Sequence, residues 1–136
     1  MDLDQARAFI KENPRSVLAT RRKDGSPQMT PIVAALDAEG RVVISSRETA
    51  YKTRNARRDP RVSVMFQTNQ FFGGHVQVDG TAEVISLPDA MELLVDYYRR
   101  LSGEHPDWDE YRAAMEAEKR LVIRVTIERA GPDRSG

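Results

Sequence analysis

Apolar and polar residues alternate along much of this chain with a period of two, which is typical of half-buried β-strands. The alternation predicts six strands, over residues 16–22, 28–36, 41–46, 61–67, 75–85 and 120–128. Short turns, the first built on Asp24-Gly25, connect the first three strands, so these are expected to form a meander. Pro31 cannot donate a ladder hydrogen bond and predicts an edge, a bulge or an interruption in the second strand. Asp79-Gly80 predicts a bulge or a sharp bend in the fifth.

Apolar residues at helical spacing predict four helices, at residues 4–12, 50–58, 86–102 and 107–117. Thr49 is expected to be the N-cap of the second helix, and Pro60 is expected to stop it. Asp107 is followed three residues later by Glu110, a capping pair that predicts the start of the fourth helix.

These elements predict a mainly β protein of the α+β class. A six-stranded antiparallel barrel, closed or split, with peripheral helices fits best, because an open sheet would leave long unprotected edges. No GxGxxG loop follows a strand, so a Rossmann fold is not expected. Residues 1–129 are expected to form a single domain and residues 130–136 a disordered tail. A deep cofactor pocket would strain a monomer of this size, so a pocket shared between two copies is expected.

Composition removes several kinds of chemistry. The chain has no cysteine, which excludes disulfides, thiolate nucleophiles and Cys-based metal sites. His75 and His105 are its only histidines and lie far apart in the sequence, so no metal site is expected. Lys plus Arg and Asp plus Glu both number 21, which argues against a general nucleic-acid-binding protein. The N-terminus is acidic and no apolar run approaches membrane length, so a cytoplasmic protein without membrane contact is expected.

Residues 51–61 carry the strongest local charge. This segment has five cations and one anion, a net charge of +4, whereas residues 86–119 have nine acids and four bases, a net charge of −5. Lys52 falls in the first turn of the predicted helix, where the backbone dipole already presents positive charge and a carboxylate would be preferred. A bound phosphate or carboxylate would neutralise both the lysine and the free N–H groups. A solvated basic helix face is the alternative interpretation.

Several short motifs follow one another along nearly the whole chain. They are 17–20 (VLAT), 24–28 (DGSPQ), 51–55 (YKTRN) with 58–61 (RDPR), 79–82 (DGTA), and a block over 98–111 that contains Gly-Glu-His and Asp-Trp. In this order they resemble the pyridoxamine-phosphate-oxidase-like superfamily of flavin and deazaflavin oxidoreductases, which has an FMN-binding split β-barrel fold. Lys-Thr-Arg-Asn and the last block look most like the small branch that uses the deazaflavin coenzyme F420.

The resemblance implies a homodimer that binds the cofactor in a groove at the subunit interface. Lys52 would meet the cofactor phosphate, and the ring would lie along residues 30–34, where a strand interrupted at Pro31 leaves backbone groups free. Relatives can carry an arginine at position 50, so in this chain one phosphate contact is missing or is supplied by Arg47 or Arg54. Residues 73–76 would approach from the other side or from the other subunit. The implied cofactor-binding residues are Thr30, Pro31, Ile32, Val33, Ala34, Ser45, Ala50, Tyr51, Lys52, Thr53, Arg54, Asn55, Gly73, Gly74, His75 and Val76.

The function implied is an F420-dependent oxidoreductase that transfers a hydride from the reduced deazaflavin to an unsaturated small organic acceptor. An FMN-dependent oxidoreductase of the same fold and a non-catalytic cofactor-binding protein are the alternatives. No catalytic triad is visible, and the candidates for a proton donor are Tyr51, His75 or solvent. His75 can equally be an exposed imidazole at a strand end. F420 carries a polyglutamate tail that FMN lacks; Arg57, Arg58 and Arg61 would attract it or would simply face solvent.

Overall fold

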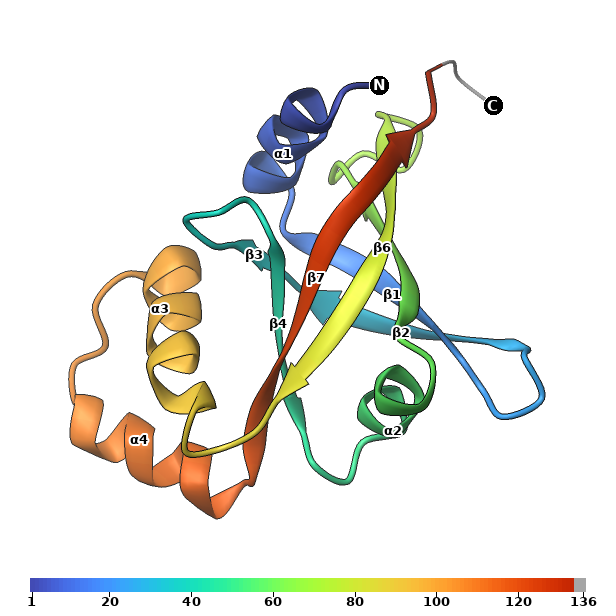
Figure 1. Cartoon of the computed structure of the whole chain (residues 1–136). Helices are drawn as coiled ribbons and strands as arrows, with labels where there is room; N and C mark the ends of the chain where they lie inside the picture. The colour runs from blue at the N-terminus through green and yellow to red at the C-terminus, as the bar shows by residue number, and fades with distance from the viewer. Residues whose placement is uncertain (134–136) are drawn as a thin grey trace.

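The computed structural model describes residues 1–133, which form four helices and seven strands (Figure 1). The helices are α1 (Leu3–Glu12), α2 (Tyr51–Arg58), α3 (Ala90–Ser102) and α4 (Trp108–Ala117). The strands are β1 (Arg15–Arg21), β2 (Pro27–Val33), β3 (Ala35–Leu36), β4 (Val42–Arg47), β5 (Arg61–Gln67), β6 (His75–Ile85) and β7 (Arg120–Gly131).

All seven strands belong to one antiparallel sheet in the order β2-β1-β5-β6-β7-β4-β3. β2 and β3 lie at opposite ends of this order, yet only Ala34 separates them along the chain. The sheet must therefore curl until its two edges meet, which gives the expected split barrel of the α+β class. Ala34 is buried at the junction, and its N–H donates to the Pro14 carbonyl at 2.9 Å. The second predicted strand breaks here into β2 and β3, so the sheet has seven strands and not six.

Pro31 lies inside β2, opposite Val17 of β1, and causes no break. The even-numbered residues of β2 face β1, because the bonds at either end of the pair are Arg22 N–H to Ser26 and Ala34 N–H to Pro14. Backbone groups of alternate residues point to the same side of a strand, so Pro31 faces the edge that has no partner strand. Its missing N–H therefore costs no ladder hydrogen bond, and of the three predicted alternatives the edge position is the one observed.

The apolar residues form two cores on the two faces of the curled sheet. Inside the barrel, Phe66, Leu18 and Ile123 are fully buried, and α1 and α2 close its two ends (Figure 1). On the outer face, α3 and α4 pack on β4 and β7 and bury Leu94 and Val122 in a second core. The outer face of β2 is left uncovered, and there Met29 is 69% and Val33 43% exposed.

Two predicted boundaries are wrong. Thr49 does not cap α2; Ala50 is the N-cap, with an extended backbone and no side-chain hydrogen bond to the helix. The tail was expected from residue 130, but Ala130 pairs with Val78 and β7 continues to Gly131. Residues 134–136 of that expected tail lie outside the described residues. Asp107 does cap α4, and its carboxylate accepts from the N–H of Glu110 at 3.1 Å.

The predicted bulge is confirmed at Asp79-Gly80, where the register of β6 against β7 shifts. Gly80 is buried, and a Cβ atom added to it would lie 2.0 Å from the carbonyl oxygen of Thr126. Because that neighbour is backbone, it cannot move aside as a flexible side chain would. The two strands approach each other this closely only because position 80 has no side chain.

Replacement of Gly80 by alanine is expected to destabilise the protein by about 1–3 kcal/mol, the usual cost of overpacking. Urea unfolding of Gly80→Ala against the wild type measures this. Gly131→Ala is the control, since a Cβ there meets nothing within 4 Å, and it should change stability by less than about 0.5 kcal/mol. Equal stabilities for the two variants would contradict the close approach of β6 and β7.

Candidate cofactor-binding site

Two buried side chains fix α2 against the barrel. Thr53 donates to the Arg47 carbonyl at 2.8 Å and accepts from the hydroxyl of Ser46, also at 2.8 Å. Asn55 donates to Thr20 at 3.1 Å and to Gln28 at 2.8 Å. Thr53 is 0% and Asn55 5% exposed. These two predicted site residues therefore bind α2 to β4, β1 and β2, and their side chains do not face solvent.

Lys52 is the centre of a group of cations at the start of α2. Burial lowers the pKa of Lys52, and the positive charges of Arg120 and Arg47 lower it further. Arg47 and Arg120 are cross-strand partners in β4 and β7, and both reach the carboxylate of Glu118, at 3.5 and 3.0 Å. Within residues 1–133, Lys52 has no carboxylate at salt-bridge distance.

The chemistry of this arrangement suits an anion. Three cations are matched by a single carboxylate, and the N–H groups in the first turn of α2 have no capping side chain. The helix dipole adds further positive potential at the same place. An anion such as a phosphate would satisfy the N–H groups and restore the pKa of Lys52. Ala50 and Tyr51, both predicted to bind the cofactor, lie at this helix start.

A tyrosine that the sequence did not indicate connects this cluster to β2. The hydroxyl of Tyr97, on α3, donates to the Val33 carbonyl at 2.7 Å. Burial raises the pKa of Tyr97, while a backbone hydrogen bond from Ser45 and the charge of Arg120 oppose that rise. The predicted site residue Val33 is therefore held by Tyr97, with Ser45 close to the same tyrosine, and the charge of Arg120 acts on both Tyr97 and Lys52.

The predicted ring-binding segment, residues 30–34, has two sides with different properties. Thr30, Ile32 and Ala34 point their backbone groups toward β1 and the Pro14 carbonyl. Pro31 and Val33 point theirs toward the free edge, as Met29 does by the same alternation. The free edge thus offers N–H groups at 29 and 33 and carbonyls at 29 and 31.

The segment 73–76 does not lie beside β2 within one chain. Ile32, Ser16, Phe66 and Val76 stand in one row across four neighbouring strands. Three strand spacings amount to ~14 Å. Gly73, Gly74, His75 and Val76 could therefore reach a ring on β2 only from a second subunit, the other arrangement that the sequence suggested.

A cationic cavity of about 560 Å³ lies between α2 and the β1–β2 hairpin. It is lined by Arg22, Lys23, Gln28, Tyr51, Arg54, Asn55 and Arg58, four cations without a carboxylate. Arg22 and Arg58 donate to neutral oxygens, the carbonyls of Pro27 and Arg21, and Arg54 stacks over the Tyr51 ring with 5.9 Å to the centroid.

The other two arginines proposed for a tail are already paired. Arg57 binds Glu48 and Arg61 binds Asp59, each at 2.8 Å. Arg58 therefore stays with the unneutralised cations, whereas Arg57 and Arg61 belong to ion pairs.

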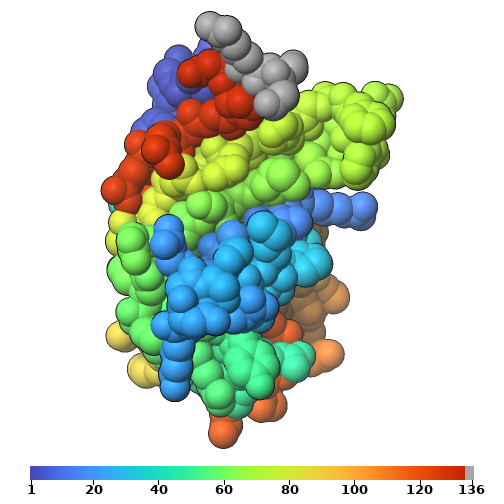
Figure 2. Space-filling model, turned by 90° about the vertical axis from the view of Figure 1, so that its right-hand side faces the viewer, coloured from blue at the N-terminus to red at the C-terminus, as the bar shows by residue number. Residues whose placement is uncertain are grey.

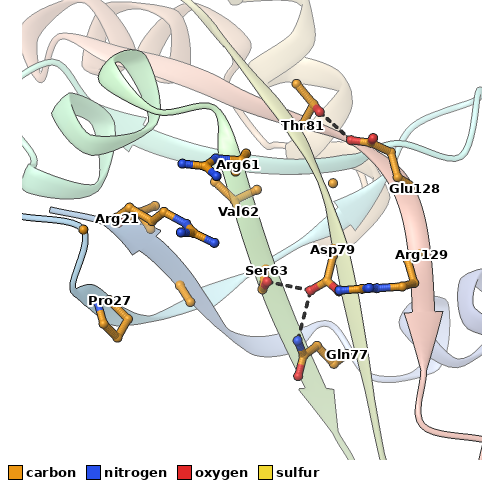
Figure 3. Close-up of a pocket in the computed structure, with 14 residues that line it drawn as sticks. Arg21, Pro27, Arg61, Val62, Ser63, Gln77, Asp79, Thr81, Glu128 and Arg129 are labelled. Carbon is orange, nitrogen blue, oxygen red and sulfur yellow. Dashed lines mark hydrogen bonds and ion pairs between the residues drawn. The ribbon is translucent and has the colours of Figure 1, made fainter. Parts of the chain in front are cut away.

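A larger cavity, of about 750 Å³, lies on the outer face of β1, β5, β6 and β7 (Figure 3). In it, Asp79 accepts from Ser63 at 2.6 Å, from Gln77 at 3.0 Å and from Arg129 at 2.7 Å. Burial opposes ionisation of Asp79, but these hydrogen bonds outweigh it and lower its pKa. The cavity shares no residue with the predicted site. Its arginines at 61 and 129 are neutralised, and among the described residues Arg21 is its one lining cation without an ion pair. The smaller cavity has four such cations and is therefore the better match to an anion.

Comparison with known proteins agrees with this architecture. Residues 3–132 match the pyridoxamine 5'-phosphate oxidase family. The chain belongs to this family. Among solved structures, the conserved hypothetical protein Rv2991 from Mycobacterium tuberculosis has 24% identity and a TM-score of 0.78, and the match covers 100% of this chain and 92% of that one.

Two further solved structures with the same fold have names that mention different cofactors. An F420 reductase has 22% identity and a TM-score of 0.67, with 90% of this chain and 93% of that chain covered. A FAD-binding protein from Mesorhizobium loti has 22% identity and a TM-score of 0.69, with 96% and 92% covered. At these identities the likeness shows the fold.

Two absences hold for the part of the chain that the structure describes. Across residues 1–133, no helix has both the length and the apolar character needed to span a membrane. In the same range, no three His, Cys, Asp or Glu side chains gather into a possible metal site.

Loss of the Thr53 hydroxyl is expected to loosen α2. Thr53→Val leaves Ser46 and the Arg47 carbonyl without their partner, which should cost about 1–3 kcal/mol in urea unfolding. Thr49→Val is the control and should cost less than about 0.5 kcal/mol, since Thr49 caps nothing. A loss of about 1 kcal/mol in the control would instead indicate that Thr49 caps the helix.

Proposed function

We propose that this protein is an oxidoreductase that binds coenzyme F420 and passes a hydride from its reduced form to an unsaturated small organic acceptor. The observation that carries this proposal is the cation cluster of Lys52, Arg47 and Arg120 at the uncapped start of α2, opposed by one carboxylate. Membership of the pyridoxamine 5'-phosphate oxidase family supports it, as does a fold shared with an F420 reductase.

The residues present fit a phosphorylated tricyclic cofactor. The cation cluster would hold the phosphate by charge-assisted hydrogen bonds. The free edge of β2 offers alternating N–H and carbonyl groups at Met29, Pro31 and Val33, which suit the polar edge of the ring. A reduced deazaflavin or flavin supplies the hydride when bound, and the protein's part is to orient it and exclude water.

The cationic cavity favours F420 over FMN. FMN ends at its phosphate, whereas F420 continues into a lactyl group and a chain of glutamates. Tyr51, which lines the cavity, directly precedes Lys52 in the first turn of α2, so the cavity and the phosphate cluster lie at the same helix. Arg22, Lys23, Arg54 and Arg58 would meet the tail carboxylates there.

The acceptor must often gain a proton as well as a hydride. Tyr51 lies at the start of α2 and is largely exposed, so its hydroxyl can reach a bound molecule. His75 could take part only from a second subunit, because β1 and β5 separate it from β2. Solvent is the third source.

Equilibrium titration with F420 and FMN, followed by Trp108 fluorescence, tests the cofactor assignment. F420 is expected to bind more tightly than FMN, and a deazaflavin without glutamates should bind with intermediate affinity. Lys52→Ala should weaken binding of all three by about 1.5–3 kcal/mol, the range for a hydrogen bond to a charged group. Arg57→Ala is the matched control, since Arg57 lies on the same helix but pairs with Glu48. Equal or tighter binding of FMN would overturn the assignment.

Steady-state assays with reduced F420 and a panel of unsaturated acceptors separate an enzyme from a protein that only binds the cofactor. Oxidation of F420 that depends on both protein and acceptor supports the enzyme. Tight binding without turnover would leave a non-catalytic cofactor-binding protein.

We propose further that two copies pair through the uncovered sheet face to complete the site. Met29 and Val33 are exposed there, and Phe71 and Phe72, 79% and 95% exposed, lie on the connection between β5 and β6. Figure 2 shows this connection, coloured lime, standing off the body of the molecule. Burial of such apolar surface is the main favourable term in association.

Met29→Asp is therefore expected to shift the protein from dimer to monomer in light scattering and to weaken cofactor binding, because a charge would enter the apolar contact. Ala113→Asp, on the exposed face of α4, is the control and should leave the mass unchanged. A wild-type monomer, or an unaltered dimer of Met29→Asp, would contradict pairing through this face.

A further inference from the structure

Among the described residues, one side-chain hydrogen bond connects the α3–α4 pair to the backbone of β2, and Tyr97 makes it. Its hydroxyl donates to the Val33 carbonyl at 2.7 Å, across 64 positions of sequence. The rest of the buried face of α3, including Leu94 and Val95, packs in the second core with Val43 and Val122. Tyr97 thus extends from that core to the free edge.

The position of Val33 gives this contact its importance. Val33 is the last residue of β2, and after Ala34 the chain leaves β1 and pairs with β4 through Ala35 and Val43. The Val33 carbonyl therefore lies where the barrel splits, with no partner strand on its side. Ser45, on β4, lies close enough to the same tyrosine for its backbone to lower the pKa of Tyr97. The Tyr97 side chain is therefore bonded to β2 and lies near β4, the two strands that border the split.

We infer that Tyr97 is a positioning residue, whose hydrogen bond to Val33 holds the free edge of β2 in the orientation that the cofactor ring requires. The inference rests on the proposed function. With the Val33 carbonyl occupied, the same peptide edge presents the Val33 N–H and the Pro31 carbonyl, one donor and one acceptor, on the side of β2 that has no partner strand. The positive charge of Arg120 acts on both Tyr97 and Lys52, which puts this edge and the phosphate cluster in the same region of the molecule.

A second tyrosine allows this role to be separated from a purely structural one. Tyr111, on α4, donates to the Leu94 carbonyl at 2.8 Å, a bond of the same chemistry and nearly the same length. That bond lies inside the α3–α4 pair and does not touch β2. Tyr97→Phe and Tyr111→Phe therefore remove equivalent hydrogen bonds, but only Tyr97→Phe removes a bond to β2.

Cofactor affinity and the visible absorption band of the bound cofactor test the inference. With F420 as the probe, Tyr97→Phe is expected to weaken binding about tenfold, as the loss of one hydrogen bond does. It should also move the absorption band back toward that of free F420, because the ring edge loses its fixed partners. Tyr111→Phe should leave affinity and band at the wild-type values, although its thermal stability falls. Tyr97→His, measured at pH 8, keeps an N–H donor and should bind more tightly than Tyr97→Phe.

Failure of the Tyr97 role and failure of the proposed function give different results. If wild type binds F420 but Tyr97→Phe matches Tyr111→Phe in affinity and absorption, the positioning role is wrong and the proposed function stands. Equal affinity of Tyr97→His and Tyr97→Phe also overturns the role. If wild type binds neither F420 nor FMN, the proposed function fails, and the positioning role fails with it.

Discussion

The crossing of the chain at Ala34 is the constraint on which the rest of the structure depends. A single run of residues serves as the partner of β1 and, after one buried alanine, as the partner of β4. The sheet can satisfy both pairings only by curling, and it cannot close completely, because β2 and β4 diverge beyond that point. The barrel interior, the two helices that close its ends and the unpaired edge of β2 all follow from this crossing. A residue with a larger side chain at position 34 would have to displace the core that surrounds it.

The repulsion between cations at the start of α2 is tolerated because buried hydrogen bonds hold the helix against the barrel. Lys52, Arg47 and Arg120 repel one another, and repulsion of this kind would normally separate exposed side chains or unwind a helix end. Thr53 and Asn55 prevent that by binding the helix to β4, β1 and β2 through buried hydrogen bonds. The same helix therefore has a buried face, with Thr53 and Asn55, whose hydrogen bonds stabilise it. Its N-terminal end carries like charges whose repulsion is unfavourable. An anion that binds there relieves that repulsion.

Much of the fold could be predicted from the sequence because it rests on local signals. The period-two alternation gave the strands, and Asp79-Gly80 gave the bulge. The break at Ala34 was missed because both neighbouring halves are equally apolar, and only the pairing partners differ. Thr49 was chosen as N-cap by residue type, but the backbone is still extended at Ala50 and the helix begins at Tyr51.

The sequence indicates the contiguous part of the candidate site, residues 50–52, but not the part that strand pairing assembles. Arg120 meets Lys52 only because β7 pairs with β4, which no local pattern reveals. Tyr97 fits the apolar spacing of α3, so no local pattern distinguishes its hydroxyl from a core position. Arg22 and Lys23 lie at the turn between β1 and β2, where polar residues are expected and carry no further signal.

The two cores have a consequence for how the molecule moves. Along β7, Val122 belongs to the outer core and its neighbour Ile123 to the inner one, so the α3–α4 pair and the barrel share a strand but not their buried side chains. Elements with separate cores can open as separate cooperative units, at less than the cost of global unfolding. In the proposed cofactor site, β2 belongs to the barrel, whereas Tyr97 belongs to a unit able to open separately. A large, rigid ligand at that site could then enter and leave by local unfolding of the α3–α4 pair, with the barrel intact throughout.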